Sequence, residues 1–119
     1  MIRRLTFAFA AAAAMLTAGQ AAAHAKLVSS TPGANAQVAA PKVISLTFNE
    51  KLAPAFSGFE LTMVEHGMKI PVKTAVSADG KTLTGTPQGA FMKGTYKVTW
   101  HAASADGHRM TGEVSFKVN

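Results

Sequence analysis

The strongest constraint on the fold of this chain is a two-residue alternation of apolar and polar side chains, repeated in four runs. Ile44, Leu46 and Phe48 alternate with polar neighbours, and residues 59–64, 95–101 and 113–118 continue the pattern. Such alternation predicts strands with one buried face. No stretch after residue 23 has a convincing helical period. Turn signals separate the runs: Thr31-Pro32-Gly33, Asp79-Gly80, Lys93-Gly94 and Asp106-Gly107. We therefore predict an all-β fold, a single β-sandwich with Greek-key links.

The first 23 residues have the layout of a secretory signal peptide. Arg3 and Arg4 form a positive start, Leu5–Ala18 is an apolar stretch interrupted by two threonines, and Ala21-Ala22-Ala23 fits a signal-peptidase site. The apolar stretch is short for a membrane span, which needs about 20 residues. We predict cleavage of residues 1–23, export, and one domain over residues 24–119. A cut after Ala25 also fits the small-residue rule and would discard His24.

Composition narrows the function of the remaining domain. Without Arg3 and Arg4 the chain has ten Lys and Arg against six Asp and Glu, a formal charge of +4. The lysines are scattered singly, with no basic cluster among aromatic residues, so nucleic-acid binding is not expected. The sequence has no cysteine. Any metal site must therefore use histidine, methionine, carboxylate or amine ligands.

A candidate metal site follows from the predicted cleavage. His24 would become the first residue, with an α-amine and an imidazole that close one chelate ring. Asp106 and His108 flank Gly107, which lets the backbone turn tightly so that both side chains point at one ion. Three nitrogens and one oxygen in a plane suit Cu(II) better than Zn(II), which prefers a tetrahedron. The alternative is a surface Asp-Gly turn beside a solvated histidine.

Several segments of residues 24–119 carry a resemblance to a known family. They are His24-Ala25-Lys26-Leu27, Ser30-Thr31-Pro32-Gly33, Ala40-Pro41, and residues 43–50, 94–100, 104–108 and 112–118. Together they resemble the CopC family of periplasmic copper-binding proteins. The resemblance implies a cupredoxin-like or immunoglobulin-like β-barrel sandwich. It implies Cu(II) bound by the His24 amine and imidazole, Asp106 and His108, with Glu50 near the ion. It also implies a periplasmic location and a CopD-type inner-membrane partner. From the residues alone, Glu50 is a carboxylate at a strand end, and a solvated surface role is its alternative. We expect the domain to be a monomer.

Some members of the family carry a second, methionine-rich site for Cu(I). The corresponding region here offers Met63, His66 and Met68, and thioethers are soft ligands that favour Cu(I). Residues 65–68 are expected to form a flexible loop after the strand that ends at Met63. The full family site uses more methionines than stand here. Met63 also falls on the inward-facing set, so core packing is the alternative. Met92 and Met110 contribute only if the fold brings them close.

We predict that the domain binds and delivers copper and is not an enzyme, because a four-ligand Cu(II) site leaves little room for a substrate. Two other classes stay open. One is a copper-dependent redox enzyme, like the polysaccharide oxygenases that chelate copper with an N-terminal histidine on a β-sandwich. The other is a metal-free interaction domain. His101 is expected to be exposed on its strand, and Trp100 to lie in the core.

Overall fold

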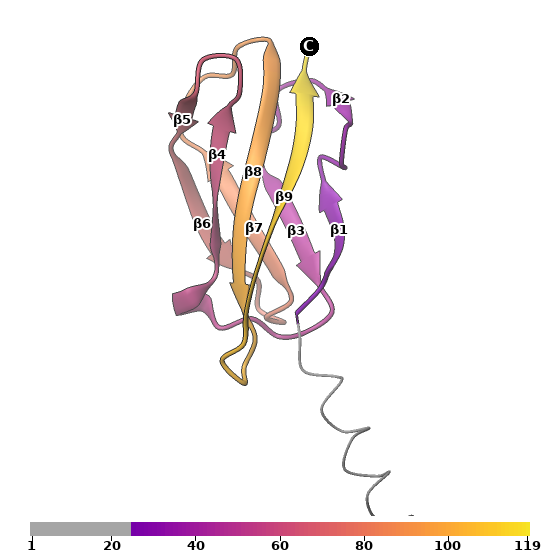
Figure 1. Ribbon diagram of the computed structural model, residues 1–119, viewed down its shortest axis with the longest axis vertical. Coiled ribbons are helices and arrows are strands. Elements are labelled where there is room, and N and C mark those ends of the chain that lie inside the picture. Colours follow the sequence, from indigo (N-terminus) through magenta and orange to yellow (C-terminus); the bar gives the residue numbers. More distant parts are fainter. Residues whose placement is uncertain (1–24) are drawn as a thin grey trace, which may run out of the picture.

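The computed structural model describes residues 25–119, which form a sandwich of two β-sheets (Figure 1). The first sheet has four strands in the order β1-β3-β7-β6. Their bounds are Leu27–Thr31 for β1, Ile44–Phe48 for β3, Val72–Val76 for β6 and Thr82–Pro87 for β7. The second has five strands in the order β2-β9-β8-β4-β5. Their bounds are Gln37–Val38 for β2, Gly58–Met63 for β4, Met68–Ile70 for β5, Gly94–Ala103 for β8 and Arg109–Val118 for β9. A short 3₁₀ helix, η2, spans Pro54–Phe56.

The prediction of an all-β sandwich is confirmed, and so are the four alternating runs. They form β3, β4, β8 and β9, and their apolar residues make up most of the buried core. The core members from these strands are Ile44, Leu46, Phe48, Phe59, Leu61, Met63, Tyr96, Val98, Trp100, Val114, Phe116 and Val118. The alternation predicts these positions because successive side chains of a strand point to opposite faces. Among residues 25–119, no helix is long and apolar enough to cross a membrane.

Strands β8 and β9 form a long antiparallel hairpin through the centre of the five-stranded sheet. Their register runs from Gly94 opposite Val118 to Ala103 opposite Arg109. The turn of this hairpin lies at the end of the sandwich where β1 begins, and the C-terminus lies at the opposite end (Figure 1). The fold therefore brings the Asp-Gly-His segment to the same end as the beginning of the described chain.

Candidate metal centre

Asp106 and His108 lie in the turn between β8 and β9. Two backbone hydrogen bonds close the turn: the Ser104 N–H donates to the His108 carbonyl at 3.0 Å, and the Gly107 N–H donates to the Ser104 carbonyl at 3.0 Å. Gly107 has a φ of +89°, a backbone conformation that residues other than glycine rarely adopt. The predicted role of Gly107 as the residue that permits the tight turn is thus confirmed.

The carboxylate of Asp106 is the centre of a small hydrogen-bond network within this turn. It accepts hydrogen bonds from the Ser104 hydroxyl and from the backbone N–H of His108, the latter at 3.1 Å. Its second oxygen, Oδ2, lies 2.8 Å from Nδ1 of His108. The Ser104 hydroxyl first, and then the ring and backbone of His108, lower the pKa of Asp106 well below its usual range. Asp106 is therefore anionic at neutral pH and in mild acid.

The spacing of Nδ1 and Oδ2 suits a shared metal ion. Because zinc and similar divalent ions bind imidazole nitrogen and carboxylate oxygen at roughly 2.0–2.2 Å, two donors at neighbouring corners of a square plane stand about 2.8–3.0 Å apart. The observed 2.8 Å falls in this range and is also the ordinary length of a hydrogen bond between an imidazole N–H and a carboxylate. Both side chains are accessible, since the His108 side chain is 60% exposed and that of Asp106 is 37% exposed. The turn thus presents two donors to solvent with a separation that a metal ion can bridge.

Short contacts join this turn to the first described residues. Ser104, at the base of the turn, pairs with Leu52 in an isolated β-bridge. Three residues before Leu52, Asn49 makes two bonds to Lys26: its Oδ1 accepts from the Lys26 N–H at 2.7 Å, and its N–H donates to the Lys26 carbonyl at 3.1 Å. Ala25 is 1% exposed and belongs to the core cluster. The chain therefore enters the sandwich beside the segment that supports the turn.

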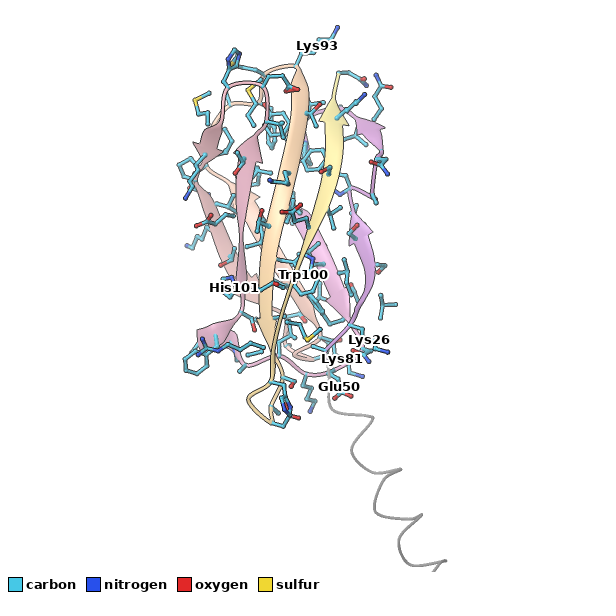
Figure 2. The ribbon with its side chains drawn as sticks, in the orientation of Figure 1. Lys26, Glu50, Lys81, Lys93, Trp100 and His101 are labelled. Carbon is cyan, nitrogen blue, oxygen red and sulfur yellow. The ribbon has the colours of Figure 1, made fainter. Side chains whose placement is uncertain are left out.

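His24, the predicted source of the remaining two donors, lies outside the described residues, as do the predicted signal peptide and its cleavage site. Within residues 25–119, no group of three or more histidine or carboxylate side chains could hold a metal. Glu50 is half-buried and lies at the same end of the sandwich as Lys26 and Lys81 (Figure 2). The described chain thus supplies the Asp106–His108 pair, with Glu50 at the same end.

The residues predicted for Cu(I) lie at the other end, where β4 turns into β5. The predicted loop over residues 65–68 is instead a tight turn of residues 64–67, because Met68 is already the first residue of β5, paired with Met63. Met63 is 2% exposed and belongs to the core, whereas Met68 is 44% exposed and His66 is exposed. Met63 therefore has the core position that the alternation allowed, and the Cu(I) assignment of the three residues stays a prediction.

Trp100 and His101 occupy opposite faces of β8, as predicted. Trp100 is 7% exposed and packs edge-on against Phe48, with 5.1 Å between ring centroids. Its indole Nε1 is buried and has no hydrogen-bond partner within residues 25–119. His101 points outward and is exposed (Figure 2). Trp100 thus belongs to the core, and His101 belongs to the outer surface of the five-stranded sheet.

Sequence reasoning did not find two contacts around the turn. One is the Ser104 hydroxyl on Asp106, for which the Ser-x-Asp spacing is a usable signal, because serine and aspartate side chains often bond within two residues in turns. The other is the guanidinium of Arg109, which lies 5.3 Å from the ring centroid of Phe56. These residues are far apart in sequence, and no local pattern indicates that they meet.

Comparison with known proteins agrees with the fold. The CopC domain family matches residues 27–119. Copper resistance protein C of Pseudomonas syringae pv. tomato is 46% identical over 125 residues, covering 99% of this chain and 98% of that protein. The crystal structure of PcoC, a methionine-rich copper resistance protein from Escherichia coli, superposes with a TM-score of 0.76. It is 42% identical and covers 82% of this chain and 100% of that one.

A second solved structure, CopC from Methylosinus trichosporium OB3b, superposes with a TM-score of 0.74. It is 31% identical and covers 81% of this chain and 94% of that one. The domain is thus a single β-sandwich of the kind found in copper resistance proteins. The chain belongs to the CopC family.

Proposed function

We propose that this chain is an exported copper-binding protein of the periplasm that acts in copper homeostasis and resistance by holding and delivering Cu(II). The observation that carries the proposal is the Asp106–His108 pair, whose donor atoms lie 2.8 Å apart in an exposed turn. Its relatives support copper as the ligand, since they are copper resistance proteins by name. The mild net charge and absence of cysteine agree with a site built from nitrogen and oxygen donors.

The proposed ligands are the amine and imidazole of His24, the carboxylate of Asp106 and the imidazole of His108. Cleavage after Ala23 creates the free amine, and His24 is bonded directly to Ala25, which is buried beside the segment that supports the turn. Three nitrogens and one oxygen in a plane favour Cu(II). Glu50, at the same end of the sandwich, adds negative charge near the ion.

Ser104, Asp106 and His108 each have a definite role in the proposed binding of copper. Ser104 and the backbone N–H of His108 hold the Asp106 carboxylate and keep it ionised before copper arrives. In the proposed site, Cu(II) would displace the proton that Nδ1 of His108 shares with Oδ2 of Asp106, and that proton would pass to solvent. Because protons compete for the nitrogens but not for this carboxylate, copper binding weakens as pH falls.

Binding and delivery, not catalysis, is the role we propose, and a CopD-type inner-membrane protein is the proposed recipient. Four protein donors in one plane leave little room for a substrate on the ion. If the chain were instead a copper-dependent redox enzyme, it would oxidise a polysaccharide when copper and a reductant are supplied. If it were a metal-free interaction domain, it would have no specific affinity for copper. We place Cu(I) at Met63, His66 and Met68 only as a secondary hypothesis, because burial of Met63 limits access to its sulfur.

The test is an intact mass of the exported chain, followed by Cu(II) titration of the same material with tryptophan fluorescence as one signal. We expect a chain that begins at His24 and binds one Cu(II) tightly. His108→Ala and Asp106→Asn should each weaken binding by at least tenfold while circular dichroism stays unchanged. His66→Ala, an exposed histidine at the opposite end, is the matched control and should bind normally.

Two results would remove the proposed site. One is a mass that begins at Lys26. The other is a chain that begins at His24 but binds Cu(II) no better than the His108→Ala variant does. If instead His66→Ala abolished Cu(II) binding, the ion would lie at the β4–β5 turn, and the residues at the β8–β9 turn would have no part in holding it.

A further inference from the structure

A cleft of about 330 Å³ opens on the outer face of the five-stranded sheet, directly beside the β8–β9 turn. Two elements form it: η2 on one side and the ends of β8 and β9 on the other. The lining residues are Ala55, Phe56, His101, Ala102, Arg109 and Thr111. None of them carries a negative charge. The cleft therefore combines an apolar wall with cationic or basic groups next to the candidate copper ligands.

Two hydrogen bonds to β8 hold the aromatic wall of the cleft in place. The Ala53 N–H donates to the Ala103 carbonyl at 2.8 Å, and the Ala103 N–H donates to the Ser57 hydroxyl at 3.1 Å. These bonds fix both ends of η2 against β8. Phe56 nevertheless remains 56% exposed, and the guanidinium of Arg109 lies over its ring at 5.3 Å from the centroid. An exposed aromatic ring with a stacked arginine is a pairing typical of interface hot spots.

The two lysine–glutamate salt bridges of this sheet face include neither Arg109 nor the exposed Lys117 at the other end of β9. Glu60 of β4 lies 3.4 Å from the Lys69 ammonium, and Glu113 of β9 lies 3.8 Å from the Lys97 ammonium. Within residues 25–119, Arg109 makes no salt bridge to a carboxylate. Its planar fork of N–H donors can still bind a carboxylate with two parallel hydrogen bonds. The cleft thus presents an arginine whose chemistry suits a carboxylate, beside an exposed aromatic ring.

We infer that this cleft is the docking site for an acidic segment of the protein that receives copper. A carboxylate of that segment binds Arg109, and an adjacent apolar side chain packs on Phe56. Since Arg109 directly follows His108, a segment bound there brings the recipient next to the candidate copper ligands. The inference rests on the proposed function for the identity of the recipient, but the chemistry of the cleft does not depend on bound copper.

The test uses the exported, ¹⁵N-labelled chain without copper and a blocked peptide in which Asp and Leu alternate. We expect saturable amide shifts that centre on Phe56, His101, Arg109 and Thr111. A peptide with Asn in place of Asp should bind about tenfold more weakly, because hydrogen bonds to charged groups are worth roughly 1.5–3 kcal/mol. Added salt should weaken the binding of the Asp peptide only.

Variants separate a specific cleft from general attraction to a positive protein. Arg109→Gln and Phe56→Ala should each weaken peptide binding by about tenfold, by loss of a charge-assisted hydrogen bond and of an interface anchor respectively. Arg109→Lys should restore only part of the affinity, because lysine keeps the charge but not the planar fork. Lys117→Gln removes the same charge from an exposed site at the other end of β9 and should leave binding unchanged.

Three outcomes would overturn the inference. The first is an equal effect of Lys117→Gln and Arg109→Gln, and the second is amide shifts spread over the scattered lysines. The third is binding to phosphatidylglycerol vesicles with no binding of the Asp peptide, which would assign the cleft to a lipid surface. A separate Cu(II) titration of the same variants keeps this result distinct from a failure of the copper site.

Discussion

Replacing Gly112 with alanine should destabilise the domain, because no space exists for the added methyl group. A Cβ built at Gly112 would lie 2.4 Å from Cζ2, 2.6 Å from Cε2 and 2.9 Å from Nε1 of Trp100, which lies directly opposite on β8. Ordinary carbon–carbon contacts lie at about 3.5–4.0 Å. The indole ring would therefore have to move by about 1 Å, or β9 would have to bend away from it.

Neither movement is free. The Trp100 ring is buried and packs against Phe48, with 5.1 Å between centroids, so it cannot retreat without disturbing the core. Bending β9 would strain the ladder that leads to Arg109 and the β8–β9 turn. Extra methyl groups forced into a packed core typically cost about 1–3 kcal/mol. At about 4–8 °C per kcal/mol for a domain of this size, Tm should fall by about 5–20 °C.

Thermal and urea unfolding followed by circular dichroism measures this loss. Gly89→Ala is the matched control, because a Cβ there meets only the Ile70 Cγ2 at an ordinary 3.7 Å. We expect Gly89→Ala to change the free energy of unfolding by less than about 1 kcal/mol. The two variants add the same methyl group to the same domain, so a difference between them reports the contact with Trp100.

A double-mutant cycle with Trp100→Phe tests the cause directly. Phenylalanine lacks Cζ2, which is the nearest of the three atoms that the new methyl group meets. Gly112→Ala should therefore cost less in the Trp100→Phe background, with a coupling of about 1 kcal/mol or more. A coupling below roughly 0.5 kcal/mol would be that of independent sites and would refute the reasoning.

Three further predictions concern the β8–β9 turn and the proposed copper site. Ser104→Ala should raise the pKa of Asp106, because it removes the first of the hydrogen bonds that lower it; a ¹³C NMR titration of the carboxylate measures the shift, and an unchanged pKa would contradict that cause. Because folding lowers the pKa of Asp106, its carboxylate stabilises the folded state at pH values above its unfolded-state pKa. This contribution to stability is lost in acid, as pH falls through the folded-state pKa of Asp106. Cu(II) affinity should fall steeply between pH 7 and pH 5, because protons compete with the ion for one amine and two imidazoles; a flat profile in a competition assay would exclude nitrogen ligands. A chain with one extra residue before His24 should lose at least tenfold in Cu(II) affinity, since it lacks the chelating amine, and equal affinity would show that the amine is not a ligand.

The sequence predicts those strands whose side chains alternate between core and solvent, and it is silent about the others. β3 alternates fully, and its apolar residues are buried as expected. β6 has no fully buried residue, and β7 contains Gly85 and Pro87, which are uncommon in strands. The position of such strands is set by pairing with neighbours: β7 lies between β3 and β6 in the sheet. That pairing is a property of the whole fold and leaves little trace in the local pattern.

The candidate site divides in a similar way. Asp106, Gly107 and His108 are adjacent in the chain, so their turn can be predicted from local chemistry. The contacts that support it are not local: Leu52 pairs with Ser104, and Arg109 packs on Phe56. Those pairs depend on how η2 and the preceding segment fold back over the end of β8. The sequence therefore predicts the candidate ligands of the turn, but not the surface that surrounds them.

In the proposed copper site, some ligands are positioned by folding and the others become available only when the signal peptide is removed. Folding alone places Nδ1 of His108 2.8 Å from Oδ2 of Asp106, and the Asp106 carboxylate is already ionised. Two donors in an exposed turn form only half of a square plane, and no third carboxylate or histidine in residues 25–119 completes a group. In the proposed site, the other half is a chain end, whose amine becomes available only when the signal peptide is removed. High affinity for Cu(II) would then arise after export, so that the precursor does not take copper from the compartment in which it is made.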